Sequence, residues 1–81
     1  MLDNKETKEK MRELIDRKKE EASHFRKNIA KHAKAIGDEI DNLTPFWLNS
    51  YIDKMQRDHI ELVRLETQIE LLEVYAEPNE E

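Results

Sequence analysis

Four basic side chains gather between Ala22 and Gly37 without a single Asp or Glu among them. The stretch therefore carries a charge of +4 inside a chain whose net charge is −5. Concentrated positive charge attracts anions, so a nucleotide, a nucleic acid or an acidic protein surface is the expected class of ligand. The basic residues are Arg26, Lys27, Lys31 and Lys34, and His24 and His32 lie among them.

Positive charge of this kind also arises where no ligand binds. Lys31 and Lys34 lie near the end of a predicted helix, where the helix dipole stabilises a cation by about 0.3–1 kcal/mol. Solvation, or the acidic tail of another protomer, would account for the remaining basic residues. Arg26 and Lys27 lie away from the helix end and are the better anion-binding candidates, and Lys31 and Arg57 are candidates beside them.

The chain offers little for catalysis or for a metal. It has no cysteine, no glycine-rich phosphate loop and no serine set beside a base. Glu21 and His24 have the Glu-x-x-His spacing of carboxylate-bridged di-iron bundles, but Gln56 breaks that pattern before His59. We therefore expect no enzymatic activity, no metal and no cofactor.

Composition favours a few long helices. The 81 residues are 37% hydrophobic and 41% charged, with one glycine and two prolines. Unbranched charged residues are well tolerated in helices, whereas sheets need frequent turns. No apolar run approaches the roughly 20 residues that cross a bilayer. We expect a single cytoplasmic domain that does not insert into a membrane.

The first of two amphipathic blocks predicts a helix over about residues 5–36, because its apolar residues recur every three or four positions. Asp3 and Glu6 form a start signal of the capping-box type. Gly37 is placed for a left-handed cap at the end of the helix. The predicted apolar seam is Met11, Ile15, Ala22, Phe25, Ile29, Ala33 and Ile36, with Lys18 among them.

The second block predicts a helix over about residues 45–76. Thr44 is a suitable N-cap, and Pro45 suits the first helical position. Residues 37–44 form a short connector, and residues 77–81 form an acidic tail. The predicted seam is Leu48, Ile52, Met55, His59, Leu62, Leu65, Ile69, Leu72 and Ala76.

Two long helices with so short a connector should fold back as an all-α antiparallel hairpin. Facing residues would have numbers that sum to about 87, which pairs Phe25 with Leu62. In that register the basic stretch faces residues 50–65, whose charges balance. We therefore expect the basic stretch to lack an acidic partner within its own hairpin.

The second helix has more apolar side chains than one seam can bury, which predicts a homo-oligomeric helical bundle or a protein partner. Trp47 and Tyr51 lie off the predicted seam, where they either cover the bend or form a recognition surface. The candidate oligomer or partner interface is Val63, Leu71, Val74 and Tyr75.

The layout resembles the small helical-hairpin proteins of tailed bacteriophages. The resemblance consists of apolar spacing, Leu48-x3-Ile52-x2-Met55 followed by Leu62-x2-Leu65-x3-Ile69-x2-Leu72. It implies action in the host cytoplasm, either as an oligomeric sponge for cyclic nucleotide signals or as an inhibitor that binds a host or phage protein.

Two functions follow as hypotheses. The first is a non-enzymatic module that binds and modulates a macromolecular partner. The second is a sponge for a small anionic nucleotide, in which Arg26, Lys27 and Lys31 of neighbouring protomers hold phosphates. Its candidate stacking residues are Phe25, Trp47 and Tyr51. The acidic net charge and the long rods disfavour sequence-specific DNA binding, while an RNA-binding bundle remains an open alternative.

Overall fold

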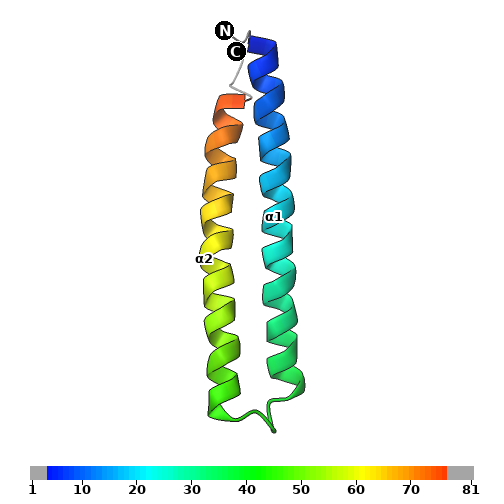
Figure 1. Cartoon of the computed structure of the whole chain (residues 1–81), viewed down its shortest axis with the longest axis vertical. Coiled ribbons are helices and arrows are strands. Elements are labelled where there is room, and N and C mark those ends of the chain that lie inside the picture. The colour runs from blue at the N-terminus through cyan, green and yellow to red at the C-terminus, as the bar shows by residue number, and fades with distance from the viewer. Residues whose placement is uncertain (1–3, 77–81) are drawn as a thin grey trace.

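The computed structural model describes residues 4–76, which form two antiparallel helices packed side by side (Figure 1). Helix α1 spans Asn4–Asp38 and helix α2 spans Pro45–Ala76. The hairpin is a rod of 58 × 19 × 18 Å. The prediction of a helical hairpin is confirmed. We call the end with the connector the turn end and the other the open end.

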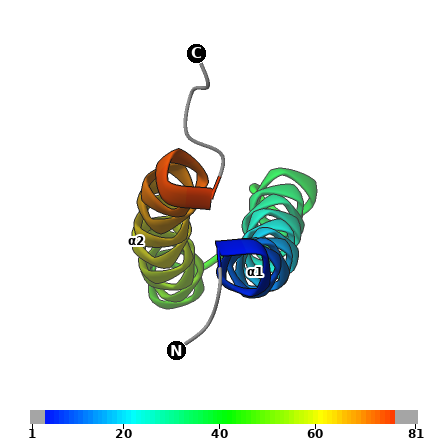
Figure 2. The ribbon, with the colours of Figure 1, turned by 90° about the horizontal axis from the view of Figure 1, so that it is seen from above.

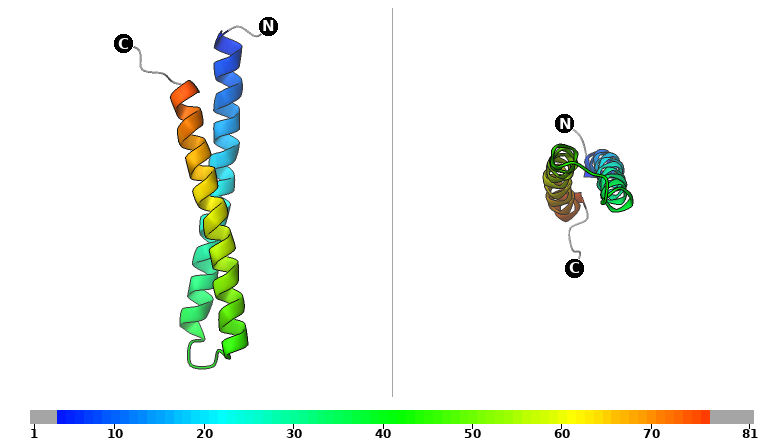
Figure 3. Two further views of the ribbon diagram at one scale, coloured as in Figure 1. Left: turned by 90° about the vertical axis from the view of Figure 1, so that its left-hand side faces the viewer. Right: turned by 90° about the horizontal axis from the view of Figure 1, so that it is seen from below.

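The side chains that each helix directs toward the other repeat in steps of seven residues. Such a repeat is shorter than two turns of a straight α-helix, so the helices wind around each other as in a coiled coil. Figure 2 shows the pair along its axis, and the side view of Figure 3 shows the helices crossing. On α1 the repeating positions are Met11, Lys18, Phe25 and His32, and Ile15, Ala22, Ile29 and Ile36. On α2 they are Leu48, Met55, Leu62, Ile69 and Ala76, and Tyr51, Asp58, Leu65 and Leu72.

This repeat corrects the predicted seam in the half of the hairpin near the turn. Ala33, Ile52 and His59 are expected in the seam from the sequence, but all three are exposed. Apolar spacing of three or four residues allows either of two adjacent residues to occupy a seam position. A strict seven-residue repeat allows only one of them. The positions are taken instead by the half-buried residues His32, Tyr51 and Asp58.

The hydrophobic core lies in the half of the hairpin near the open end. No side chain between residues 23 and 61 is buried. Met11, Phe25, Ile29 and Leu72 pack against the core at its edges. The buried residues are Ile15, Ala22, Leu62, Leu65, Ile69 and Ala76.

The predicted register is confirmed by one hydrogen bond across the hairpin. Lys18 Nζ donates to Gln68 Oε1 at 2.8 Å, and these residue numbers sum to 86. The predicted start of α2 is also confirmed, because the Trp47 N–H donates to Thr44 Oγ1 at 3.3 Å as in a side-chain N-cap. Pro45 is the first residue of the helix.

The predicted left-handed cap at Gly37 is wrong. Helix α1 continues through Asp38, and no residue in the described range has a positive φ. The Glu39 N–H donates to the Ala35 carbonyl at 3.1 Å, and Lys34 Nζ contacts Asp38 Oδ2 at 2.6 Å, so both interactions support the last turn of the helix. The predicted start signal at Asp3 and the acidic tail at 77–81 lie outside the described residues.

Neither α1 nor α2, over the residues described, is long and apolar enough to cross a membrane.

Candidate functional site

Two ion pairs join the helices along one side of the hairpin, which we call the ion-pair side. Lys19 Nζ lies 3.1 Å from Glu73 Oε2, and Arg26 lies 2.6 Å from Glu66 Oε2. Each partner lies seven residues from the next on its own helix, so both pairs occupy equivalent positions. Because these side chains are about half exposed, each pair is expected to contribute less than about 1 kcal/mol.

The Arg26 pair corrects the expectation that the basic stretch lacks an acidic partner in its own hairpin. The expected register pairs residues in the seam, whereas residues on the flank of an antiparallel pair meet with a stagger. On the ion-pair side the paired numbers sum to 92, which brings Glu66 within reach of Arg26. Lys34 is also paired, to Asp38 of its own helix.

Two basic residues have charges that no acidic side chain neutralises among the described residues. Lys27 and Lys31 are exposed on the outer face of α1, and neither has an ion-pair partner among the described residues. Arg57 is exposed on α2 and has no hydrogen bond or ion pair among the described residues. The three remain candidates for anion binding, but the structure of one chain does not assemble them with Arg26 into a single site.

The candidate stacking residues are also kept apart. Phe25 packs against the core. Tyr51 lies against His32, with 5.8 Å between the ring centroids, and His32 is seven residues, about 10 Å of helix, from Phe25. Trp47 is 55% exposed at the start of α2 and contacts Phe46 at a centroid distance of 5.3 Å. Within the described residues, Phe25, Tyr51 and Trp47 therefore do not come together into one aromatic platform beside Arg26.

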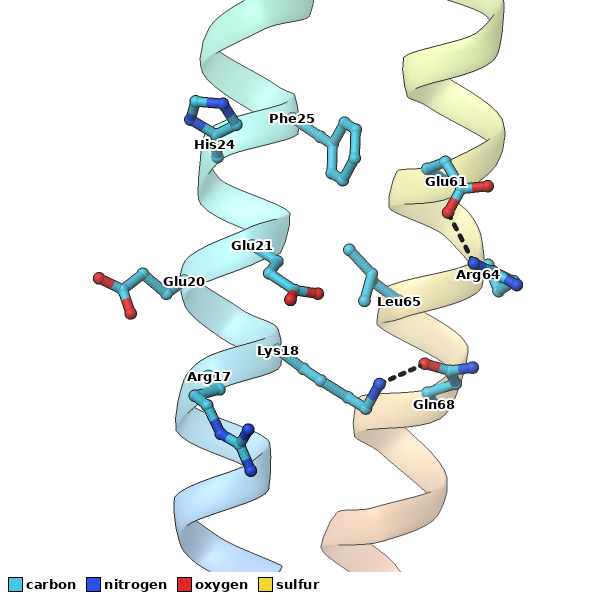
Figure 4. Close-up of a pocket in the computed structure, with 10 residues that line it drawn as sticks. All are labelled: Arg17, Lys18, Glu20, Glu21, His24, Phe25, Glu61, Arg64, Leu65 and Gln68. Carbon is cyan, nitrogen blue, oxygen red and sulfur yellow. Dashed lines mark hydrogen bonds and ion pairs between the residues drawn. The ribbon is translucent and has the colours of Figure 1, made fainter.

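A groove of about 700 Å³ lies between the helices on the side opposite the ion pairs (Figure 4). Four of the polar residues that line it bind one another in pairs, since Lys18 donates to Gln68, and Arg64 donates to Glu61 Oε1 at 2.8 Å. Figure 4 shows Phe25 and Leu65 directed toward each other from the two helices. Over the described residues there is no group of three or more His, Asp or Glu side chains that could hold a metal.

A second groove, mostly apolar and of about 680 Å³, opens near the turn end; we call it the turn-half groove. Ile52 and His59 line it and lie fourteen and seven residues before Glu66, so the groove is on the ion-pair side. The predictions from sequence missed this groove, because they assign Ile52 and His59 to the seam. The signal that would have revealed it is the strict seven-residue repeat. The lining residues are Ile29, Ile36, Ile52, Met55, Gln56, His59 and Ile60.

A third apolar surface lies at the open end of α2. Leu71, Val74 and Tyr75 are 58%, 65% and 70% exposed, and we call them the open-end patch. Leu71 lines a shallow groove of about 270 Å³ together with Leu14, and Tyr75 lies seven residues after Gln68. Because Gln68 marks the side opposite the ion pairs, Leu71 and Tyr75 lie across the rod from the turn-half groove. Val63, 46% exposed, lies between the two surfaces along α2.

Comparison of the chain with protein-family models, with curated proteins and with solved structures gave no match.

Proposed function

We propose that this protein is a non-enzymatic binding protein, an oligomeric helical hairpin that binds and modulates a macromolecular partner. The open-end patch carries this proposal. Leu71, Val74 and Tyr75 are large apolar or aromatic side chains, adjacent in space on one helix, and more than half of each is exposed. Contiguous exposed apolar surface of this kind marks interaction sites in proteins that do not aggregate.

The charge around the patch narrows the partner's chemistry. The segment 66–81 carries six acidic residues and no basic one. Glu66 and Glu73 are neutralised by ion pairs to α1, but Glu70 is exposed and unpaired among the described residues. A protein surface with an apolar centre and a basic rim fits this patch, and Tyr75 is the type of residue that anchors such interfaces. If the chain is phage-encoded, as its resemblance to hairpin proteins of phages implies, that partner is a protein of the host.

A matched pair of substitutions tests this proposal. Ile60 and Val74 lie fourteen residues apart on the same line of α2, and they are 64% and 65% exposed. We expect a protein captured from a lysate by the unmodified chain to be lost with Val74→Glu, because a carboxylate would be desolvated at the contact. Capture should persist with Ile60→Glu. Equal capture by the unmodified chain and by Val74→Glu would show that the open-end patch is not the binding surface.

The second candidate function, sequestration of a small anionic nucleotide, is favoured by one observation, the unpaired charges of Lys27 and Lys31. It needs two protomers that bring these residues together, and Arg26 would have to exchange Glu66 for a phosphate. Thermal unfolding with cyclic di- and trinucleotides decides this point. A rise in the melting temperature that is abolished by Lys27→Glu would support the sponge, and no rise with any of them would exclude it.

A further inference from the structure

The turn half of the hairpin has a groove where the open half has a core. Ile29, Ile36 and Met55 are only half-buried there, and Ile52 and Ile60 on its rim are 39% and 64% exposed. In the open half, the Arg26–Glu66 and Lys19–Glu73 pairs cover the same side of the rod. A chain of this size with so small a core commonly needs a second subunit to complete it.

We propose that a second copy of this chain closes the turn-half groove, groove against groove, about a twofold axis parallel to the rod. In this dimer both turn ends point the same way, and α1 of each copy packs against α2 of the other. The proposal rests on the oligomeric part of the proposed function and specifies its interface. Leu71 and Tyr75 of the open-end patch lie across the rod and are left uncovered by this dimer, and Val74 lies on the line of Ile60 but beyond the groove.

The shapes of the two helix surfaces that border the turn-half groove favour this arrangement. We call them the α1 wall and the α2 wall. Ala33 lies seven residues after Arg26 on the ion-pair side, and Ala30 and Gly37 flank it one turn away, so the α1 wall is low. A Cβ added at Gly37 would meet no atom within 4 Å, which shows open space above this wall. The α2 wall is high, with Ile52 and Ile60 projecting from it. The high wall of one copy therefore fits over the low wall of the other.

Charge complementarity favours the same arrangement. Exposed charged residues flank the proposed contact: α1 carries Lys27 and Lys34 on its outer face, with Lys34 paired to Asp38 of its own helix, and α2 carries Asp53. In the observed register Lys34 and Asp53 lie at the same height on the rod. Packing α1 of one copy on α2 of the other therefore brings opposite charges together. The alternative twofold arrangement packs α1 on α1 and would bring the two basic stretches against each other, which is unfavourable.

The dimer also limits what the basic residues can do. Lys31 lies on the face of α1 away from the groove, so the Lys31 side chains of two copies would point in opposite directions. A nucleotide bridging them is not expected in this assembly.

The mass in solution tests the interface. We expect the unmodified chain to have about twice its 9.7 kDa mass in sedimentation equilibrium at micromolar concentration. Ile60→Glu should weaken self-association at least tenfold, whereas Val74→Glu, with the same exposure on the same helix, should leave it unchanged. Both positions are exposed, so both variants should keep the helical circular dichroism of the hairpin. A single-chain mass for the unmodified protein, or equal masses for the two variants, would overturn the proposal.

Engineered disulfides test the arrangement, because the chain has no cysteine. Ala30 of one copy should meet Gln56 of the other, whereas within one chain these Cα atoms are about 12 Å apart by helix geometry, beyond the roughly 7 Å limit for a disulfide. We expect a mixture of Ala30→Cys and Gln56→Cys chains to give a cross-linked dimer after oxidation, and Ala30→Cys alone to give none. Cross-linking of Ala30→Cys with itself, or none in the mixture, would contradict this dimer.

These outcomes separate the two proposals. Loss of the dimer in Ile60→Glu with retained capture of a partner supports both, since Val74 lies about 21 Å along α2 from Ile60 and does not line the turn-half groove. A dimer that captures no partner contradicts the proposed function alone. A monomer that captures a partner through Val74 contradicts the dimer and the oligomeric part of the proposed function, and leaves the binding of a partner supported.

Discussion

Replacing Leu65 with alanine is expected to lower the free energy of unfolding by about 3 kcal/mol. Leu65 is 5% exposed and belongs to the core with Ala22 and Ile69. A buried leucine truncated to alanine loses its transfer free energy and leaves a cavity, since neighbouring side chains fill the space only in part. The whole core lies in the open half of the hairpin, so this loss is a large share of the stability of so small a protein.

Urea unfolding followed by circular dichroism measures this effect, at one fixed protein concentration because self-association stabilises the folded state. Leu71→Ala is the matched control: it removes the same atoms from the same helix at a position that is 58% exposed. We expect the control to change the free energy of unfolding by less than about 0.5 kcal/mol. Similar losses for the two variants would show that Leu65 is not in the core.

Replacing His32 with phenylalanine is expected to stabilise the hairpin by about 1 kcal/mol. His32 occupies a seam position, and its Nδ1 atom is buried without a hydrogen-bond partner among the described residues. A buried polar atom without a partner costs free energy, because it has given up its hydrogen bond to water. Phenylalanine removes that atom and keeps an aromatic ring against Tyr51, 5.8 Å away in the structure.

Thermal unfolding compares this variant with His24→Phe. His24 is exposed on the same helix, with its ring 6.4 Å from Phe25, so its replacement should have little effect on the melting temperature. A lower melting temperature for His32→Phe than for the unmodified chain would contradict the assignment of an unpaired buried nitrogen. If the added hydrophobicity alone caused the effect, the melting temperatures of both variants would rise equally.

Local signals in the sequence were sufficient for the helices and their pairing. Thr44 and Pro45 indicate where α2 begins, because a side-chain cap and a proline act within one turn. The match of two long seams determines the register, which the bond between Lys18 and Gln68 confirms. Gly37 misled the prediction, because glycine permits a left-handed cap without requiring one, and here α1 continues past it.

The surfaces were harder to predict, because they depend on a small difference in helical repeat. Whether Tyr51 or Ile52 enters the seam follows from the seven-residue repeat established by Leu62, Leu65 and Ile69, and apolar spacing alone does not decide it. That choice exposes Ile52 and creates the turn-half groove. The partner of Arg26 was missed for a related reason, since the stagger between flanking positions is visible only when both helices are placed.

Whether a second copy closes the turn-half groove can be measured on the unmodified chain through its methionines. Met55 lines this groove, whereas Met11 packs at the core near the open end, and both are half-buried in the single hairpin. Peroxide oxidises a methionine according to its exposure, and mass spectrometry follows each residue separately. We predict that Met55 oxidises several-fold more slowly in concentrated than in dilute solution, while the rate at Met11 stays constant. Rates at Met55 that do not change with protein concentration would contradict the dimer.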